Sequence, residues 1–358
     1  MPAPRPQPWL FSRNLDLAAF TGSTLAGFAL VGLAAWRGWL HEPVASPLWL
    51  LLVVGVDVAH VHATWLRTYF DPGELRAHPW RYALVPLLAW SLGAALHARS
   101  GLLFWRVLAY LAVFHFVRQQ LGWVALYQRR EADLAPVDRA LDRAAVYSAT
   151  LWPLLWWHAH LPRAFSWFVA GDFAGPLAMG VVKALLPLHL LLLGAFLLRQ
   201  GLRWLREGFL PVGKLLLVAT TALSWHVGIV LLDSDLAFTA LNVLPHGLPY
   251  AVLVWRATRE GGVRGGFAGS LQKAGPALFA ALLLGLAFIE EGLWDAGIWH
   301  DHEAIFGSLF GGGWDLGPAA QALVVPLLAL PQAAHYLLDG MIWKRPRATP
   351  AGSPHPPG

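Results

Sequence analysis

The sequence predicts an all-α fold, a polytopic integral membrane bundle of about ten transmembrane helices. The chain has 358 residues, of which 57% are hydrophobic and 13% charged, and its mean hydropathy is +0.51. These values are typical of multi-pass membrane proteins and exclude an ordinary soluble domain. Apolar runs of about 20 residues, the length that crosses a bilayer, recur along the chain. Cysteine is absent, which excludes disulfides, thiolate metal sites and a cysteine nucleophile.

The apolar runs predict ten membrane helices in chain order. Their ranges are 16–36, 46–69, 80–98, 102–126, 144–162, 175–198, 212–232, 236–256, 274–297 and 317–342. The fifth is the weakest, because Pro153 and a WWHAH stretch interrupt it, and Pro245 and Pro249 are expected to bend the eighth.

The distribution of basic residues predicts how the bundle is oriented. With the N-terminus in the cytoplasm, twenty Lys and Arg fall at the inside ends and loops and four at the outside ones. This bias predicts that both termini are cytoplasmic and favours a bacterial-type inner membrane. The basic residues lie in short loops, so the net charge of +5 indicates orientation and no nucleic-acid partner.

The segments between and after the spans are short or polar. Residues 127–143 are charged and predict a short amphipathic surface helix, whereas residues 257–272, rich in Gly and Arg, predict a flexible connector. We expect one domain over residues 1–344, followed by a disordered Pro/Gly-rich tail at 345–358.

The second span carries the most unusual stretch, DVAHVHATWLRTYFD, from Asp57 to Asp71. At 100° per residue, Asp57, His60 and Thr64 fall on one stripe, and His62 points the other way. Ionisable side chains inside a bilayer are costly, so they usually face a bundle interior and mark a functional site.

Three other spans carry a histidine at a similar depth. His115 lies in FHFVRQQLGW, His246 in NVLPHGLPY and His335 in PQAAHYLLDGMIW. Imidazoles on several facing helices are what a metal site in a bundle requires. The sequence therefore predicts an intramembrane metal centre in the cytoplasmic half, with these candidate ligands: His60, His62, His115, His246 and His335.

Charged residues beside these histidines are candidates for catalytic roles. Asp57 and Asp339 lie within four residues of a candidate ligand and can bind the metal or orient the imidazoles. Arg118 is expected to pair with a carboxylate such as Asp57 or to bind an anionic group. A histidine and carboxylate set without thiolate suits mononuclear or dinuclear non-haem iron, with another transition metal or haem as alternatives.

A second polar group is predicted nearer the outside. It comprises Glu290, Glu291 and Asp295 of the ninth span, with His226 of the seventh at a similar depth. Carboxylates in apolar surroundings can carry protons or bind a cation. The alternative is that they are simply buried partners of the histidines.

Four phrases of the sequence resemble a family of bacterial histidine-rich multi-pass membrane proteins that brings no established activity. The phrases are DVAHVHATWLRTYFD, FHFVRQQLGWVALY, NVLPHGLPY and HYLLDGMIWK. The architecture also resembles that of the membrane β-carotene-cleaving dioxygenases, which bind iron through histidines on several helices. This resemblance transfers no individual ligand, and it implies oxygen chemistry on a lipid-soluble substrate.

The leading functional prediction is a metal-dependent membrane oxidoreductase or oxygenase. Its expected partners are membrane lipid, a hydrophobic small-molecule substrate and an electron donor. GxGxxG, P-loop, GxSxG and HExxH motifs and the histidine boxes of membrane desaturases are absent. Three alternatives remain open: a proton- or cation-coupled transporter using the same residues, a bis-histidine haem protein, and a structural factor whose histidines are hydrogen-bonded.

Overall fold

The computed structural model describes residues 7–131, 134–260, 266–311 and 313–343, and every regular element among them is helical. Eight of the helices are long and apolar enough to cross a membrane, which indicates a multi-pass membrane protein. Their bounds are Arg13–Arg37, Ser46–Leu66, Gly101–Gln128, Met179–Glu207, Val212–Leu231, Asp235–Arg259, Pro276–Trp299 and Pro318–Ile342. The predicted all-helical fold of a multi-pass membrane protein is confirmed.

Two further long helices stand where the third and fifth spans are predicted. They are α6 (Pro79–Arg99) and α8 (Pro136–Ala159). Neither is among the eight helices that are apolar enough to span a membrane. The structure thus has a helix in each predicted place, and the count of ten spans stays a prediction.

The elements follow one another in simple chain order. They are α1 (Arg13–Asp16), η1 (Leu17–Gly22), α2 (Ser23–Arg37), α3 (Ser46–Trp49), η2 (Leu50–Val58), α4 (Ala59–Leu66), α5 (Pro72–Ala77), α6, α7 (Gly101–Gln128), α8, α9 (Met179–Glu207), α10 (Val212–Trp225), η3 (His226–Leu231), α11 (Asp235–Glu260), α12 (Gly266–Ala274), α13 (Pro276–Trp294), η4 (Asp295–Trp299), α14 (Glu303–Phe310), α15 (Pro318–Leu328) and α16 (Leu330–Ile342). The four η elements are π-helical segments inside longer helices.

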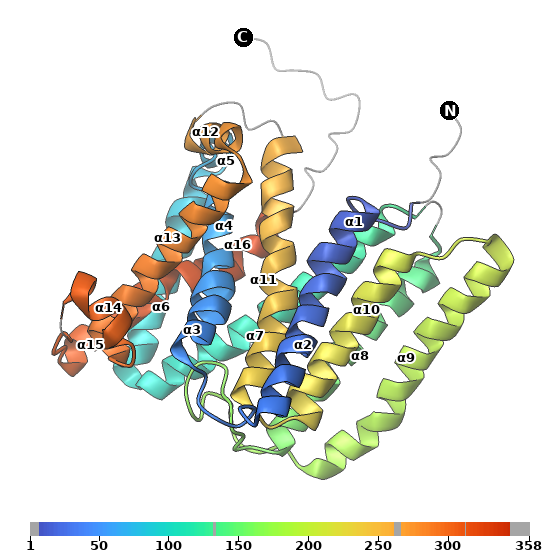
Figure 1. Cartoon of the computed structure of the whole chain (residues 1–358), viewed down its shortest axis with the longest axis horizontal. Helices are drawn as coiled ribbons and strands as arrows, with labels where there is room; N and C mark the ends of the chain where they lie inside the picture. The colour runs from blue at the N-terminus through green and yellow to red at the C-terminus, as the bar shows by residue number, and fades with distance from the viewer. Residues whose placement is uncertain (1–6, 132–133, 261–265, 312, 344–358) are drawn as a thin grey trace, which may run out of the picture.

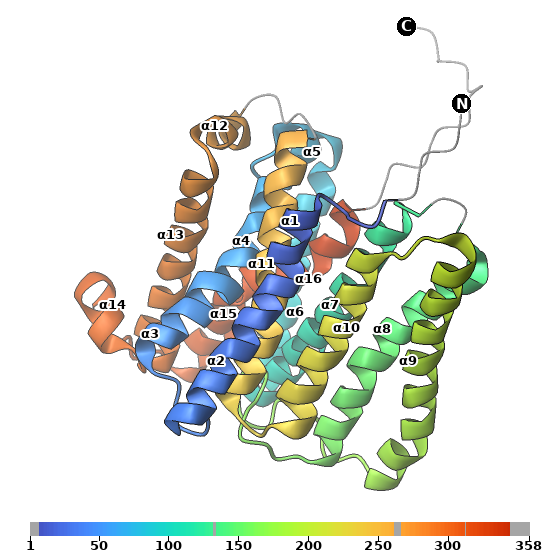
Figure 2. The same cartoon turned by 45° about the vertical axis from the view of Figure 1, so that its right-hand side comes forward.

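The long helices run side by side as one bundle, with α1, α5 and α12 at one end and α3 and α14 toward the other (Figures 1 and 2). Helix α11 lies centrally and packs against α2, η2 and α4. Helices α8 and α9 pair at one edge. Helix α9 exposes most of its leucines, which suits a lipid-facing surface.

Local sequence explains where several helices begin and end. Ser100 caps α7 by accepting a hydrogen bond from the Leu103 N–H. Gly38 and Gly208 end α2 and α9 with a left-handed backbone that other residues adopt only at a cost. These signals make the helices start and stop at the two ends of the bundle.

Three of the four helices that carry a candidate ligand are irregular close to it. The π-helical segment η2 runs directly into α4, which bears His60. Pro245 and Pro249 flank His246 inside α11 and remove two backbone donors. The last span is broken at Ala329, just before Pro331, so that α16 starts as a separate helix five residues before His335.

The charged segment 127–143 does not form the surface helix that its composition predicts. Helix α7 continues to Gln128, and Pro136–Arg143 is the first part of α8. Asp138 and Asp142 are buried there. The prediction was wrong because cations on other helices neutralise these carboxylates, a tertiary contact that the segment's own composition does not reveal.

Two other predicted segments lie partly or wholly outside the described residues. Residues 261–265 of the predicted flexible connector 257–272 lie outside the described part of the chain. Gly266–Ala274 forms the short helix α12. The tail 345–358, predicted to be disordered, also lies outside the described part of the chain.

Candidate metal centre

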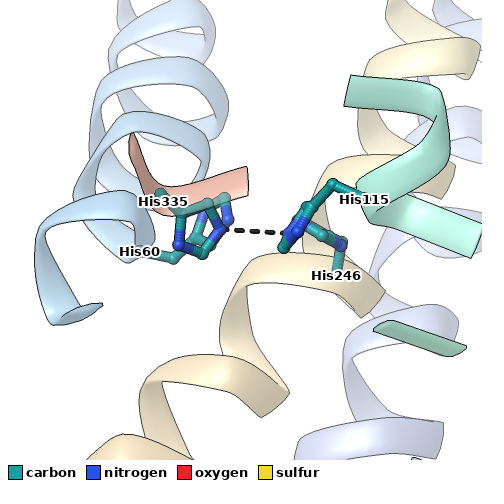
Figure 3. Close-up of side chains that lie close together, drawn as sticks. All are labelled: His60, His115, His246 and His335. Carbon is teal, nitrogen blue, oxygen red and sulfur yellow. Dashed lines mark hydrogen bonds between the residues drawn. The ribbon is translucent and has the colours of Figure 1, made fainter. Parts of the chain in front are cut away.

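Four buried histidines from four helices converge on one point. His60 comes from α4, His115 from α7, His246 from α11 and His335 from α16. One ring nitrogen of each lies within 4.8 Å of the corresponding nitrogens of the other three, so the group could hold a metal ion. Figure 3 shows the four rings turned toward one another, His60 and His335 facing His115 and His246. Packing of α4 on α11 and α16, and of α16 on α7, brings them together.

Three of the rings are held from behind through Nδ1. His60 Nδ1 lies 3.2 Å from the Val56 carbonyl oxygen, and His335 Nδ1 lies 2.6 Å from Thr64 Oγ1. His115 Nδ1 faces Asp339 Oδ2 at 3.8 Å. Partners of this kind fix the orientation of metal-binding imidazoles and leave Nε2 free to bind.

The nitrogens that face inward are short of partners. His60 Nε2 and both ring nitrogens of His246 are buried without a hydrogen-bond partner. The only close contact among the inward nitrogens is His115 Nε2 to His335 Nε2, at 3.0 Å. A buried polar atom without a partner costs about 1–3 kcal/mol, so the arrangement suits a ligand that binds several nitrogens at once.

The spacing also fits a single ion. Imidazole nitrogens bind zinc at about 2.0–2.1 Å, so neighbouring ligand atoms around a tetrahedral ion lie roughly 3.3 Å apart. The four nitrogens already lie within 4.8 Å of one another, and a small contraction brings them to such a distance.

Neighbouring side chains fix the positions of the four candidate ligands. Thr64 Oγ1, which contacts His335, also lies 2.9 Å from the Tyr250 hydroxyl. Asp339 accepts a hydrogen bond from Trp343 Nε1 at 2.6 Å. The His246 ring stacks on Phe116 with the ring centres 3.6 Å apart. These contacts restrain the rotamers of the candidate ligands.

Gly247 allows α11 to approach the helix that bears His60. A Cβ atom at this position would lie 2.8 Å from Val56 Cγ1, 3.0 Å from the Val56 carbonyl oxygen and 3.3 Å from His60 Nδ1. Any larger residue would push the two helices apart. Gly247 was not predicted from the sequence, although its position beside His246 between two prolines is a signal of irregular backbone.

Two predicted members lie outside the group. His62 points to the other side of α4, where its Nε2 lies 3.0 Å from Glu290 Oε2. It lies two residues past His60, on the other side of the helix, so α4 cannot direct both to the same point. Arg118 is exposed on α7 and does not join the buried group. The predicted pairing of Arg118 with a carboxylate such as Asp57 is not found among the described residues, because Arg118 lies on an exposed face of α7, and its binding of an anionic group stays a prediction.

The two predicted carboxylates lie at the edge of the centre. Asp57 Oδ1 is 3.9 Å from His60 Nδ1, and Asp339 Oδ2 is 3.8 Å from His115 Nδ1. Neither belongs to the four-nitrogen group. Their geometry is that of side chains that orient or polarise ligands.

The second polar group is only partly assembled. Glu290, Glu291 and Asp295 are buried on α13 and η4, and Asp295 accepts a hydrogen bond from the His302 N–H at 2.7 Å. His226 lies elsewhere, stacked on Trp152 between α8 and η3. Equal depth in a membrane does not place two residues on adjoining helices.

A cavity of about 890 Å³ reaches down to the layer next to the histidines. Its lining includes Asp57, Phe116, Asn242, Gln332 and Tyr336, and each of these lies within about one helical turn of a candidate ligand. None of the four histidines lines the cavity. Phe116 stacks on His246, and Tyr336 stacks on His115 with ring centres 5.0 Å apart. These two aromatic rings therefore lie between the cavity and the centre.

No family model, curated protein or solved structure matches this chain.

Proposed function

We propose that the chain is an integral membrane metalloprotein that holds one non-haem iron on His60, His115, His246 and His335. The observation that carries the proposal is the convergence of four buried imidazoles whose inward nitrogens lack other partners. Such orphaned nitrogens are expensive in an apolar interior unless an ion binds them. The three rings held through Nδ1 supply the outer contacts that metal-binding histidines usually have.

Mononuclear binding is favoured over dinuclear binding. Two-metal sites hold their ions about 3.5–4 Å apart and need enough ligands to bind both. Here one compact set of four nitrogens is present among the described residues, and Asp57 and Asp339 lie outside it. One ion fits this donor set better than two.

The contacts among the rings argue against haem. The ring centres of His60 and His246 are 4.7 Å apart, and those of His115 and His335 are 4.4 Å apart. Side chains from four helices fill the space around them. A porphyrin would need an open slot between two opposed histidines, and this crowded arrangement has none.

The proposed activity is oxidation or oxygenation of a lipid-soluble molecule. Iron with an open coordination position supplies oxygen activation, for which an electron donor is the expected partner. The protein supplies fixed ligands, apolar surroundings that limit water, and an aromatic-lined cavity beside the centre. Membrane lipid surrounds the bundle and delivers the hydrophobic substrate.

We also propose ten spans with both termini on the cytoplasmic side, in a bacterial-type inner membrane. Helices α6 and α8 support this count, since each is long and packs along neighbouring spans. The excess of Lys and Arg in the loops of one side supports the orientation. Accessibility of single cysteines, introduced into this cysteine-free chain at Arg99 and Arg206, tests it: only the Arg99 site should react from outside.

Elemental analysis of the purified protein, with a visible spectrum of the same sample, tests the metal assignment. We expect about one iron per chain and no Soret band. His246→Ala should lower the metal content at least about tenfold. His189→Ala is the matched control, since His189 is a buried histidine bonded to Ser148 and distant from the group. Equal metal content in both variants, or metal-free protein after growth with ample iron, would refute the assignment.

A second candidate function is proton- or cation-coupled transport. The observation that favours it is the buried contact between His62 and Glu290, with Glu291 next in the chain and Asp295 about one turn further on. This function predicts pH-dependent flux in liposomes that Glu290→Gln abolishes, in protein that contains no iron.

A further inference from the structure

The cavity opens among the loops at the end of the bundle opposite α1. Its lining includes residues of the α2–α3 loop (Leu40–Pro43), the α8–α9 loop (Arg163–Ala170) and the η3–α11 junction (Asp233–Asp235). From there it extends to Asp57 and Phe116, beside the candidate metal centre. A volume of about 890 Å³ is near the upper end of the range for small-molecule sites, about 300–1,000 Å³.

Aromatic rings form a large part of its walls. Ten aromatic side chains line the cavity: Trp49, Trp105, Phe116, Phe165, Trp167, Phe168, Phe238, Trp294, Trp299 and Tyr336. Three of them, Trp105, Trp294 and Trp299, pack together with ring centres 5.4–5.9 Å apart. Flat, rigid walls of this kind suit an extended apolar molecule.

The charged groups of the lining are almost all acidic, although the chain as a whole has a net charge of +5. One lysine or arginine lines the cavity, Arg163, against these carboxylates: Glu42, Asp57, Asp233, Asp235, Glu291 and Asp301. Arg163 is already engaged, since its Nε lies 2.9 Å from Asp233 Oδ1 and it also donates to the Leu232 carbonyl. Partial burial opposes ionisation of Asp233, but hydrogen bonds from Arg163 and the Ala164 N–H lower its pKa below the ordinary value. The guanidinium is thus neutralised and is not free to bind an anionic ligand.

Two buried acceptors face the deep part of the cavity without a partner. Glu291, 7% exposed, makes no hydrogen bond or ion pair with the described residues. Asn242 donates through its Nδ2 to Phe238, but its Oδ1 is buried and unpaired. Both side chains line the cavity. Unpaired acceptors in an apolar site favour a ligand that brings a hydrogen-bond donor.

We infer that the cavity binds an elongated apolar molecule whose polar end is a hydroxyl or amino group, and that it rejects the corresponding carboxylic acid anion. Aromatic walls take the apolar body, and Glu291 and Asn242 accept from the head group. A carboxylate head would meet several carboxylates and find no free lysine or arginine among the lining residues. The inference rests on the proposed function in taking this cavity as the substrate site, and it narrows the substrate class to molecules without an acid group.

Three molecules with the same tail test the inference: oleyl alcohol, oleylamine and oleate. Saturable binding of tritiated oleyl alcohol to the purified protein is measured first, and the other two compete for it. We expect the alcohol and the amine to bind at least about tenfold more tightly than oleate. Glu291→Gln should reduce that difference to about threefold or less, because an amide can donate to a carboxylate as well as accept.

A matched pair of tryptophan substitutions locates the binding. Val53→Trp adds a large ring to the cavity wall and should lower the affinity for all three molecules. Leu191→Trp adds the same ring to the exposed face of α9 and should leave affinity unchanged. A thermal melt of each variant verifies folding.

Three results would overturn the inference: no saturable binding, oleate binding as tightly as the alcohol, or equal binding by the Val53→Trp and Leu191→Trp proteins. Repeating the measurement on metal-free His335→Ala protein separates the two proposals. If that variant binds selectively, the cavity inference stands even if the iron assignment fails. If the unsubstituted protein contains iron but does not bind selectively, the iron assignment stands and the cavity inference fails.

Discussion

At the scale of single residues, the candidate centre depends on what lies behind each ligand. The four imidazoles come from different helices, and their usefulness as ligands depends on which nitrogen each presents. Val56, Thr64 and Asp339 occupy the Nδ1 side of three rings. These three partners, only one of which is charged, turn Nε2 toward the common point.

The Thr64 hydroxyl provides the most direct test of this arrangement. Thr64→Val keeps the shape of the side chain and removes the hydrogen bond to His335 Nδ1 and the contact with Tyr250. We expect metal affinity to fall about 10–100-fold with little loss of folded protein. Competition with a calibrated chelator measures it. Thr68→Val is the control, since the Thr68 hydroxyl donates to the Thr64 backbone carbonyl and contacts none of the candidate ligands, and equal affinities in the two variants would contradict the role of the Thr64 hydroxyl.

Gly247 is the residue whose size most directly sets a helix distance. Gly247→Ala places a Cβ 2.8 Å from Val56 Cγ1 and 3.0 Å from the Val56 carbonyl oxygen. Overpacking of this kind costs about 1–3 kcal/mol, so both the melting temperature and the metal content should fall. Gly285→Ala, a helical position with open space around it, should raise or preserve stability. A melting temperature for Gly247→Ala equal to that of the control would show that the helices separate at no cost.

At the scale of helices, the irregular backbone lies where the ligands are. A π-helical segment precedes His60, two prolines flank His246, and a break precedes His335. Helices interrupted inside a membrane commonly mark binding sites, because the freed backbone groups and the altered side-chain directions are put to use. Helix α7, which carries His115, is regular and serves as a straight support.

A buried ion-pair network joins Glu131, just past the end of α7, with α8, α9 and α10 at the cytoplasmic end of the proposed topology. Lys214 Nζ lies 2.6 Å from Glu131 Oε1 and 2.7 Å from Asp142 Oδ2, and Arg203 contacts the other oxygen of Glu131 at 2.6 Å. Lys214 and Asp142 are fully buried. This network was not predicted from the sequence, although a lysine inside the apolar run 212–232 is a signal that a carboxylate must lie nearby.

The network predicts strong coupling between substitutions. Lys214→Met removes the cation that Glu131 and Asp142 share. Because buried negative charge is then left without a partner, the protein should be destabilised by about 3–5 kcal/mol. Adding Asp142→Asn to Lys214→Met should recover a large part of that loss, because one uncompensated charge disappears. Thermal or denaturant unfolding of both variants in the same detergent measures the difference. Additive losses would mean that the two side chains are not energetically coupled.

At the scale of the whole molecule, a bound ion would tie four helices that are far apart in sequence. His60 and His335 are separated by most of the chain, yet their rings lie with centres 5.1 Å apart. An ion that binds only the folded state stabilises it by about 2.7 kcal/mol at a free concentration a hundredfold above its Kd. The metal would thus act on stability as well as on chemistry.

Removal of the metal tests this global role. We expect a membrane-permeant chelator to lower the melting temperature of the purified protein by several degrees and iron to restore it. The His246→Ala protein should not respond to either addition. A chelator-dependent shift of the same size in that variant would place the responsible metal elsewhere.

The sequence determined the helical membrane class and much of the candidate ligand set. Apolar runs of membrane length and the loop charges need no tertiary contact to be interpreted, because bilayer thickness alone sets their scale. The stripe of Asp57, His60 and Thr64 also showed that His60 and His62 point in different directions, and the folded chain has the same arrangement. Depth along each helix grouped His62 with His60, His115, His246 and His335, because residues at equal depth on facing helices can meet, and only the folded chain separates His62 from the other four.

Only the tertiary structure decided which residues at equal depth do meet. Arg118 lies outside the buried centre, His226 stacks on Trp152, and Asp142 is buried beside Lys214. Helix periodicity gives the relative directions of side chains on one helix, but it does not give the rotation of one helix against its neighbours. That rotation is set by side-chain fit, by close approaches such as Gly247 on Val56 and by backbone breaks. Because these are contacts between distant segments, they could not be inferred from one sequence alone.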